Sequence, residues 1–236
     1  MKIRIKFAKE GDMKFIGHLD VMRYFQKVMR KADVDIRYSE GFSPHQIMSF
    51  AAPLGVGITS SGEYVDIEVI STDSSEEMLR RMNEVAVEGI TFLSYRRLPD
   101  PAASAMSIVA AADYTVTFRE GKEPADWEAF AAGLGEFGKR EQILVMKQTK
   151  KGEKETDIRP MIHSLTVEGR EVHMKLATGS VANLKPDVVI RAYMDSVGLP
   201  LEEFALLVHR DEVYGSLGEG EQQRLVPLDQ LGGDIE

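Results

Sequence analysis

The chain has 236 residues, of which 43% are hydrophobic and 28% are charged, and its formal net charge is −9. This is an ordinary globular composition, and the length suits two domains of about 100 residues each. Because the chain has no cysteine, it has no disulfide, no cysteine-ligated zinc or iron–sulfur cluster and no thiol nucleophile.

No stretch approaches the roughly 18 apolar residues that a membrane span needs. The first residues alternate charged and apolar side chains, which is typical of a strand and not of a signal peptide. We therefore expect a cytoplasmic protein without a membrane partner.

The first part of the chain alternates strand and helix patterns. In chain order we expect a strand at 3–8, a helix at 18–32, strands at 35–38, 46–51 and 63–70, a helix at 74–87 and a strand at 90–95. Ser74 and the acidic residues after it supply the capping chemistry that starts the second helix. This order predicts a ferredoxin-like, split βαβ domain over 1–97.

Two prolines and several small residues within 98–105 indicate a linker, which we place at 98–111. A similar order then follows: a strand at 114–119, a helix at 124–137, strands at 142–148, 162–167 and 172–177, a helix at 184–197 and a strand at 204–209. We therefore predict an α+β fold of two tandem ferredoxin-like domains, the second over 112–214. The acidic segment 215–236 has few apolar residues and is expected to be a mobile tail.

The charge is unevenly distributed, because residues 1–50 have a net charge of +4 and the remainder −13. On the expected helix at 18–32, apolar residues recur at helical spacing, and the opposite side carries Arg23, Lys27, Arg30 and Lys31. This face either contacts a polyanion or is only solvated.

The start of this helix and the loop after it contain the candidate site residues. His18 is either a site residue or a half-buried histidine, and Asp20 suits the positive end of the helix dipole. The loop passes through Gly41 and Pro44, and such a rigid polar loop usually has a function. Its candidate binding residues are Arg37, Tyr38, Ser39, Phe42, Ser43 and His45.

Three histidines, His163, His173 and His209, lie near predicted strands without the spacing of metal ligands, so we expect no metal and no cofactor. Residues 139–159 contain seven basic and four acidic side chains. The segment 150–154 within them is expected to be a hairpin tip, either solvated or part of a binding surface.

Several short motifs together resemble a known family. They are Gly17-His18-Leu19-Asp20, Tyr38-Ser39-Glu40-Gly41-Phe42-Ser43-Pro44-His45, Ser49-Phe50, Pro53-Leu54-Gly55-Val56 and Glu63-Tyr64 with Asp66. They resemble the radical-SAM-linked (radical-SAM-associated) bacterial proteins, a family of uncharacterised function. Its members are encoded beside a radical SAM protein or fused to its end. Beyond residue 70 the resemblance thins to Asn183-Leu184-Lys185-Pro186 and the chain length.

The resemblance implies a radical SAM protein as partner, which fits the missing cysteines because the iron–sulfur cluster would lie on the other protein. The order of the elements is also loosely similar to the RAMP proteins of CRISPR systems. These include repeat-processing endoribonucleases built from two ferredoxin-like domains, but fold does not fix function.

We therefore expect a non-catalytic accessory protein that presents an RNA, either tRNA or rRNA, to a radical SAM enzyme. Lysine and arginine would contact phosphates, while Tyr38, Phe42 or His45 would stack on unpaired bases. Two alternatives stay open. One is a protein-only adaptor of the radical SAM partner, and the other is a metal-independent endoribonuclease that uses His18 or His45 as acid or base.

Overall fold

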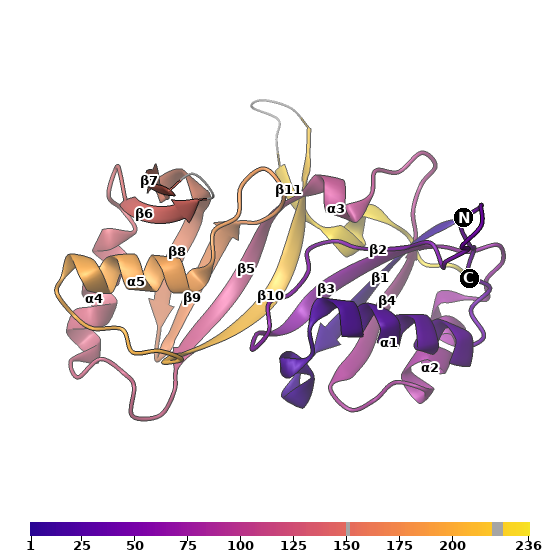
Figure 1. The fold of residues 1–236 in the computed structure, drawn as a ribbon, viewed down its shortest axis with the longest axis horizontal. Coiled ribbons are helices and arrows are strands. Elements are labelled where there is room, and N and C mark those ends of the chain that lie inside the picture. The colour runs from indigo at the N-terminus through magenta and orange to yellow at the C-terminus, as the bar shows by residue number, and fades with distance from the viewer. Residues whose placement is uncertain (150–151, 219–223) are drawn as a thin grey trace. The chain divides into compact units, whose positions relative to one another are not determined.

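The computed structural model describes residues 1–149, 152–218 and 224–236 (Figure 1). The chain forms two compact units. Unit 1 contains Met1–Ala111 and Arg210–Glu236, and unit 2 contains Ala112–His209. The predicted α+β class is confirmed, since both units combine helices with antiparallel strands. None of the described helices is long and apolar enough to cross a membrane.

The order of elements in unit 1 follows the prediction closely in its first 97 residues. The elements are β1 (Lys2–Lys9), η1 (Gly11–Phe15), α1 (His18–Lys31), β2 (Met48–Phe50), β3 (Thr59–Glu68), α2 (Ser75–Glu84), β4 (Ile90–Arg97) and α3 (Ala105–Ile108). The C-terminal part of the chain adds the end of β10 (Leu206–Leu217), β11 (Arg224–Pro227) and η4 (Leu228–Leu231). Ser74 caps α2 as expected, because its side chain accepts a hydrogen bond from the Glu77 amide.

The strands of unit 1 are interleaved in the order β4-β1-β3-β2, and all three pairings are antiparallel. Ile5 in β1 lies opposite Val65 in β3 and Tyr95 in β4. This strand order, with one βαβ element inserted into another, corresponds to a split βαβ plan. β10 also lies beside β3, and the two approach closely at Gly62, where a Cβ atom would lie 2.5 Å from the Asp211 carbonyl oxygen.

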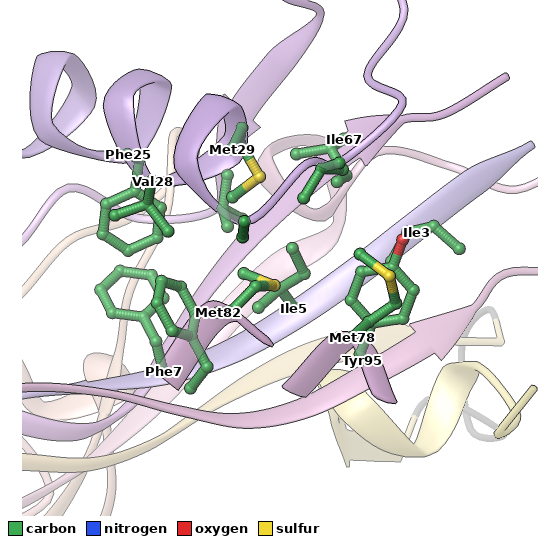
Figure 2. Packing of buried hydrophobic residues seen from close by; sticks show 14 of the residues in the cluster. Ile3, Ile5, Phe7, Phe25, Val28, Met29, Ile67, Met78, Met82 and Tyr95 are labelled. Atoms are coloured by element: carbon green, nitrogen blue, oxygen red, sulfur yellow. The ribbon is translucent and has the colours of Figure 1, made fainter. Parts of the chain in front are cut away.

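The core of unit 1 lies between this sheet and its two helices, which cover the same face (Figure 1). Figure 2 shows apolar side chains of α1 and α2 directed at strand side chains. The Phe7 and Phe25 rings are 4.6 Å apart between centroids. The apolar stripe read from the helix sequence therefore packs on alternate residues of β1. Core members include Ile3, Ile5, Phe7, Phe25, Val28, Met29, Ile67, Met78, Met82 and Tyr95.

Unit 2 repeats the interleaved strand order, because β5 lies between β9 and β10 and β8 follows β9. Its helices α4 and α5 pack through the rings of Phe130 and Tyr193, whose centroids are 5.4 Å apart. The elements are β5 (Val109–Phe118), α4 (Trp127–Phe137), β6 (Leu144–Thr149), β7 (Gly152–Asp157), η2 (Arg159–Met161), β8 (Ile162–Glu168), β9 (Glu171–Ala177) and α5 (Pro186–Ser196).

The strand expected at 142–148 does not belong to the main sheet of unit 2. The segment predicted at 142–148 forms β6, which pairs with β7 in a separate two-stranded sheet. Residues 152–154, which we expected in a hairpin tip, instead belong to β7 and pair with β6, while Lys150 and Lys151 lie outside the described residues. Lys154, the one basic residue of β7, is consequently on a hairpin separate from the main sheet.

The C-terminal part of the chain differs from the expected tail and domain boundary. The expected second domain ended at residue 214, whereas residues from Arg210 onward belong to unit 1. In the segment expected to be mobile, β11 pairs with β10, Leu228 is fully buried, and the Ile235 amide donates to Ser75 Oγ at 2.9 Å. The few apolar residues of this segment are enough to hold it in place, because they pack against the core of unit 1.

Replacing Leu228 with alanine tests this packing. Leu228 is 0% exposed, so its truncation should lower the free energy of unfolding by about 2–5 kcal/mol, the usual cost of a buried leucine cavity. Urea unfolding measures the change. The matched control is Leu93→Ala, because Leu93 is 44% exposed in β4. Equal, small effects of both substitutions would show that the C-terminal segment does not pack on unit 1.

Candidate functional site

The solvent-facing side of α1 is positively charged. Arg23, Lys27, Arg30 and Lys31 are exposed, while the side chains on the opposite side of the helix are buried in the core. Arg23 pairs with Asp20 at 3.1 Å, but both side chains are about two-thirds exposed, so the pair is weak. Among the described residues, the other three cations form no ion pair with any carboxylate. They are therefore available to a ligand.

The loop at 37–46 is held to the sheet by its own backbone. The Arg37 amide donates to the Glu68 carbonyl at 2.7 Å, and the Ile47 amide donates to the Arg37 carbonyl at 2.9 Å. Tyr38 and Gln46 form an antiparallel bridge above this point. The expected strand at 35–38 is thus reduced to isolated bridges, and the loop is a short closed hairpin.

A serine and a histidine close the hairpin from inside. The Ser39 amide donates to the His45 carbonyl at 2.8 Å, and Ser39 Oγ accepts from the His45 amide at 3.1 Å. Ser39 Oγ also lies 2.8 Å from His45 Nδ1, to which it can donate when the imidazole proton is on Nε2. Gly41 has a φ of +107°, which favours glycine, and the next residue, Phe42, is fully exposed.

Gln46 connects this hairpin to α1. Its Nε2 donates to the Gln26 carbonyl at 3.3 Å and to the Tyr38 hydroxyl at 3.4 Å, and the residue is buried. At 3.6 residues per turn, Arg23 and Arg30 lie within about 60° of Gln26 around the helix axis. The hairpin therefore adjoins the basic side of α1. We call the exposed cations of α1 and residues 37–45 the α1–hairpin surface.

The two candidate catalytic histidines have different surroundings. His18 is half-buried at the start of α1, with its ring edge-on to Phe50 at 5.1 Å. Within the described parts of the chain, no hydrogen bond, ion pair or ring contact joins His18 to His45. Each histidine has its own neighbours, so this structure does not assemble an acid–base pair from them.

The motif residues Glu63, Tyr64 and Asp66 have structural partners on both faces of β3. Glu63 accepts two hydrogen bonds from Arg210, at 2.7 and 2.5 Å. Tyr64 donates to Glu212 at 2.6 Å, and Asp66 accepts from Arg4 at 2.7 and 2.9 Å. These contacts build the fold, and we do not place the three residues in the candidate site.

Lys9 and His163, which lie outside the α1–hairpin surface, have displaced pKa values. Burial lowers the pKa of Lys9, although nearby Glu63 favours the charged amine. Burial, with the charge of Lys175 next in importance, lowers the pKa of His163. The Nδ1 atom of His173 lies within hydrogen-bond distance of Thr115 Oγ1, at 3.1 Å. Over the residues that the structure describes, no three histidine, aspartate or glutamate side chains cluster closely enough to hold a metal ion.

The α1–hairpin surface combines three kinds of group that suit a single-stranded nucleic acid. Its cations can contact phosphates, its exposed ring can stack on a base, and its hydroxyl groups can form hydrogen bonds. The sequence identified these residues but missed Gln46, which places the hairpin beside the helix. No charge or motif distinguishes a neutral glutamine of this kind in the sequence.

Comparison with solved structures gives a distant match to a chain in the crystal structure of a Cbf5–Nop10–Gar1 complex. The two sequences are 11% identical, and the TM-score is 0.43. The match covers 89% of this chain and 48% of the other, so the chain spans about half the length of that relative.

Among curated proteins, no sequence matches the chain. A family model described as "Uncharacterized protein conserved in bacteria (DUF2344)" matches residues 2–186, which is well over half of the sequence. The chain therefore belongs to this bacterial family.

Proposed function

We propose that the chain is a cytoplasmic, non-catalytic accessory protein that binds tRNA or rRNA and presents it to a radical SAM enzyme. The observation that carries the proposal is the exposed Phe42 ring, held on a closed hairpin beside the cations of α1. A base stacked on an exposed aromatic ring removes apolar surface of both partners from water, which favours binding.

The local charge makes RNA binding compatible with an acidic protein. Exposed charges more than about 8–10 Å apart are largely screened at physiological ionic strength, so a phosphate responds mainly to nearby groups. On α1 those groups are Lys27, Arg30 and Lys31, which lack ion-pair partners in the described structure. The acidic remainder would limit non-specific binding elsewhere on the molecule.

The radical SAM partner is supported by the sequence resemblance and by exposed apolar side chains near the start of α1. Phe15, Leu19 and Val56 are each about 60% exposed. The Gly57 amide donates to the Lys14 carbonyl at 2.8 Å, so the segment carrying Val56 is fixed to η1. A cluster of exposed apolar side chains that is mostly aliphatic suits a protein surface better than an RNA.

Removing the four helix cations should weaken RNA binding. Binding through four phosphates predicts that log K falls with log salt with a slope of about −3, and the variant R23A/K27A/R30A/K31A should flatten that slope. Filter binding over a salt series measures it, with bulk tRNA and rRNA fragments as probes. The charge-matched control is K122A/K139A/K185A/R191A, which removes four exposed cations from unit 2. If both variants lose affinity equally, α1 is not the binding face.

Truncating the exposed ring should affect affinity without affecting the salt dependence. Phe42→Ala should lower RNA affinity by about 5- to 150-fold, because stacking contributes roughly 1–3 kcal/mol per base. The slope with salt should stay unchanged, since no charge is lost. Phe204→Ala is the matched control, because Phe204 is an exposed phenylalanine in unit 2. An unchanged affinity for Phe42→Ala would contradict base stacking at the hairpin.

Recovery of the tagged chain from its own bacterium separates the proposal from its alternatives. We expect a radical SAM protein together with a discrete tRNA or rRNA, identified by mass spectrometry and sequencing. Recovery of the radical SAM protein without RNA would instead indicate a protein-only adaptor. RNA that is cleaved by the parent, but bound uncleaved by His18→Ala or His45→Ala, would indicate a ribonuclease.

A further inference from the structure

Unit 2 contains a cavity of about 470 Å³ that is separate in sequence from the α1–hairpin surface. It lies by the end of β5, the start of α4 and the turn between β8 and β9. Its volume is in the range of small-molecule sites. The lining residues are Thr117, Phe118, Glu123, Trp127, Arg170 and Glu171.

The indole of Trp127 forms a fixed aromatic wall of this cavity. Its Nε1 donates to the Gly169 carbonyl at 2.7 Å. The Phe118 ring meets it edge-on at 6.0 Å, and the Phe130 ring packs against it at 5.1 Å. A tryptophan with its polar atom satisfied and aromatic neighbours in place is a pre-organised platform for a flat ligand.

The guanidinium of Arg170 forms a movable cover above this platform. It lies over the Trp127 ring, 5.2 Å from the centroid, and the residue is exposed. Arg170 belongs to the two-residue turn between Glu168 and Glu171, so its side chain extends from a turn and not from the core. A flat ring inserted below it needs two spacings of about 3.5 Å, which an outward movement of about 2 Å provides.

The charges around the cavity favour a base and disfavour a phosphate. Glu123 and Glu171 supply two carboxylates against one guanidinium, so the lining has a net charge of −1. Carboxylates repel a phosphate but accept hydrogen bonds from ring and amino N–H groups. Glu171 is also 3.5 Å from His173 Nε2, which limits the directions in which its carboxylate can turn.

We propose that this cavity binds one unpaired nucleobase, preferentially guanine, stacked between Trp127 and Arg170. Guanine presents N1–H and N2–H donors side by side, and one carboxylate accepts both. Adenine presents only its N6 amino group, and uracil only N3–H. Stacking of an unpaired base between an aromatic ring and an arginine is a common mode of single-strand recognition. The proposal rests on the proposed function for its choice of an RNA base as ligand.

Trp127 is the only tryptophan in the chain, so its fluorescence reports on this cavity alone. Titration of the full chain with guanosine, excited where nucleosides do not absorb, should give saturable quenching. Adenosine should bind more weakly and uridine most weakly, and guanosine monophosphate should bind no more tightly than guanosine. Absence of saturable quenching by guanosine would overturn the proposal.

Two variants test the roles of the cover and the acceptors. R170A should weaken guanosine binding by about 5- to 150-fold, the range of base stacking, and E123Q/E171Q by a similar factor, the range of bidentate base contacts. The matched controls R191A and E202Q/E203Q change exposed residues of unit 2 and should bind as the parent does. Circular dichroism checks folding. If the cavity is a cage for organic cations, R170A should bind tetramethylammonium more tightly and leave guanosine quenching unchanged, which would overturn the proposal.

The α1 variant R23A/K27A/R30A/K31A separates this proposal from the proposed function. It should lose RNA affinity but keep the guanosine affinity of the parent. Salt-dependent RNA binding without guanosine quenching would overturn only the base site. Guanosine quenching in a chain that binds no RNA would overturn only the RNA-presenting function, leaving a site for a free nucleoside.

Discussion

The ion pair of Glu63 and Arg210 fixes the strand on which the C-terminal part of unit 1 depends. Both side chains are almost completely buried, and Arg210 also donates to the Ala52 carbonyl at 2.6 Å. Removing one partner of such a pair leaves a buried charge uncompensated, at a cost of about 3–5 kcal/mol. Arg210 is the first residue of the chain's return to unit 1, so this contact anchors β10 where the chain re-enters that unit.

The neighbouring position on β3 secures the same strand from the other face of the sheet. Successive side chains of a strand point to opposite faces, so Tyr64 is directed away from Glu63. Burial, reinforced by the charge of Glu212, raises the pKa of Tyr64 well above its usual value. The phenol stays protonated and donates to Glu212, which also accepts from Lys6 at 2.6 Å. β10 is thus held to β3 by side-chain contacts on both faces of the sheet, through Arg210 on one face and Glu212 on the other.

Local patterns in the sequence predicted most elements of the first 97 residues but not these contacts. The apolar stripe of α1 and the cap at Ser74 depend on residues within one helix, and both were predictable. The pair of Glu63 and Arg210 joins residues 147 positions apart. No periodicity connects them, so the C-terminal segment was interpreted as a tail. The same limit applies to the cavity of unit 2, where Trp127 at the start of α4 meets Gly169 in a turn 42 positions later.

The two proposals divide the recognition of RNA between two surfaces by charge. On α1, unpaired cations suit phosphates, which are the same in every sequence and give affinity without discrimination. In unit 2, two carboxylates beside Trp127 suit the N–H donors of a base. These donors differ between bases, so the contacts discriminate one base from another but add little electrostatic attraction to the RNA. An acidic chain gains from this division. In these proposals the overall charge keeps non-specific polyanion binding low, while the cationic face of α1 supplies affinity and the cavity of unit 2 supplies base selectivity.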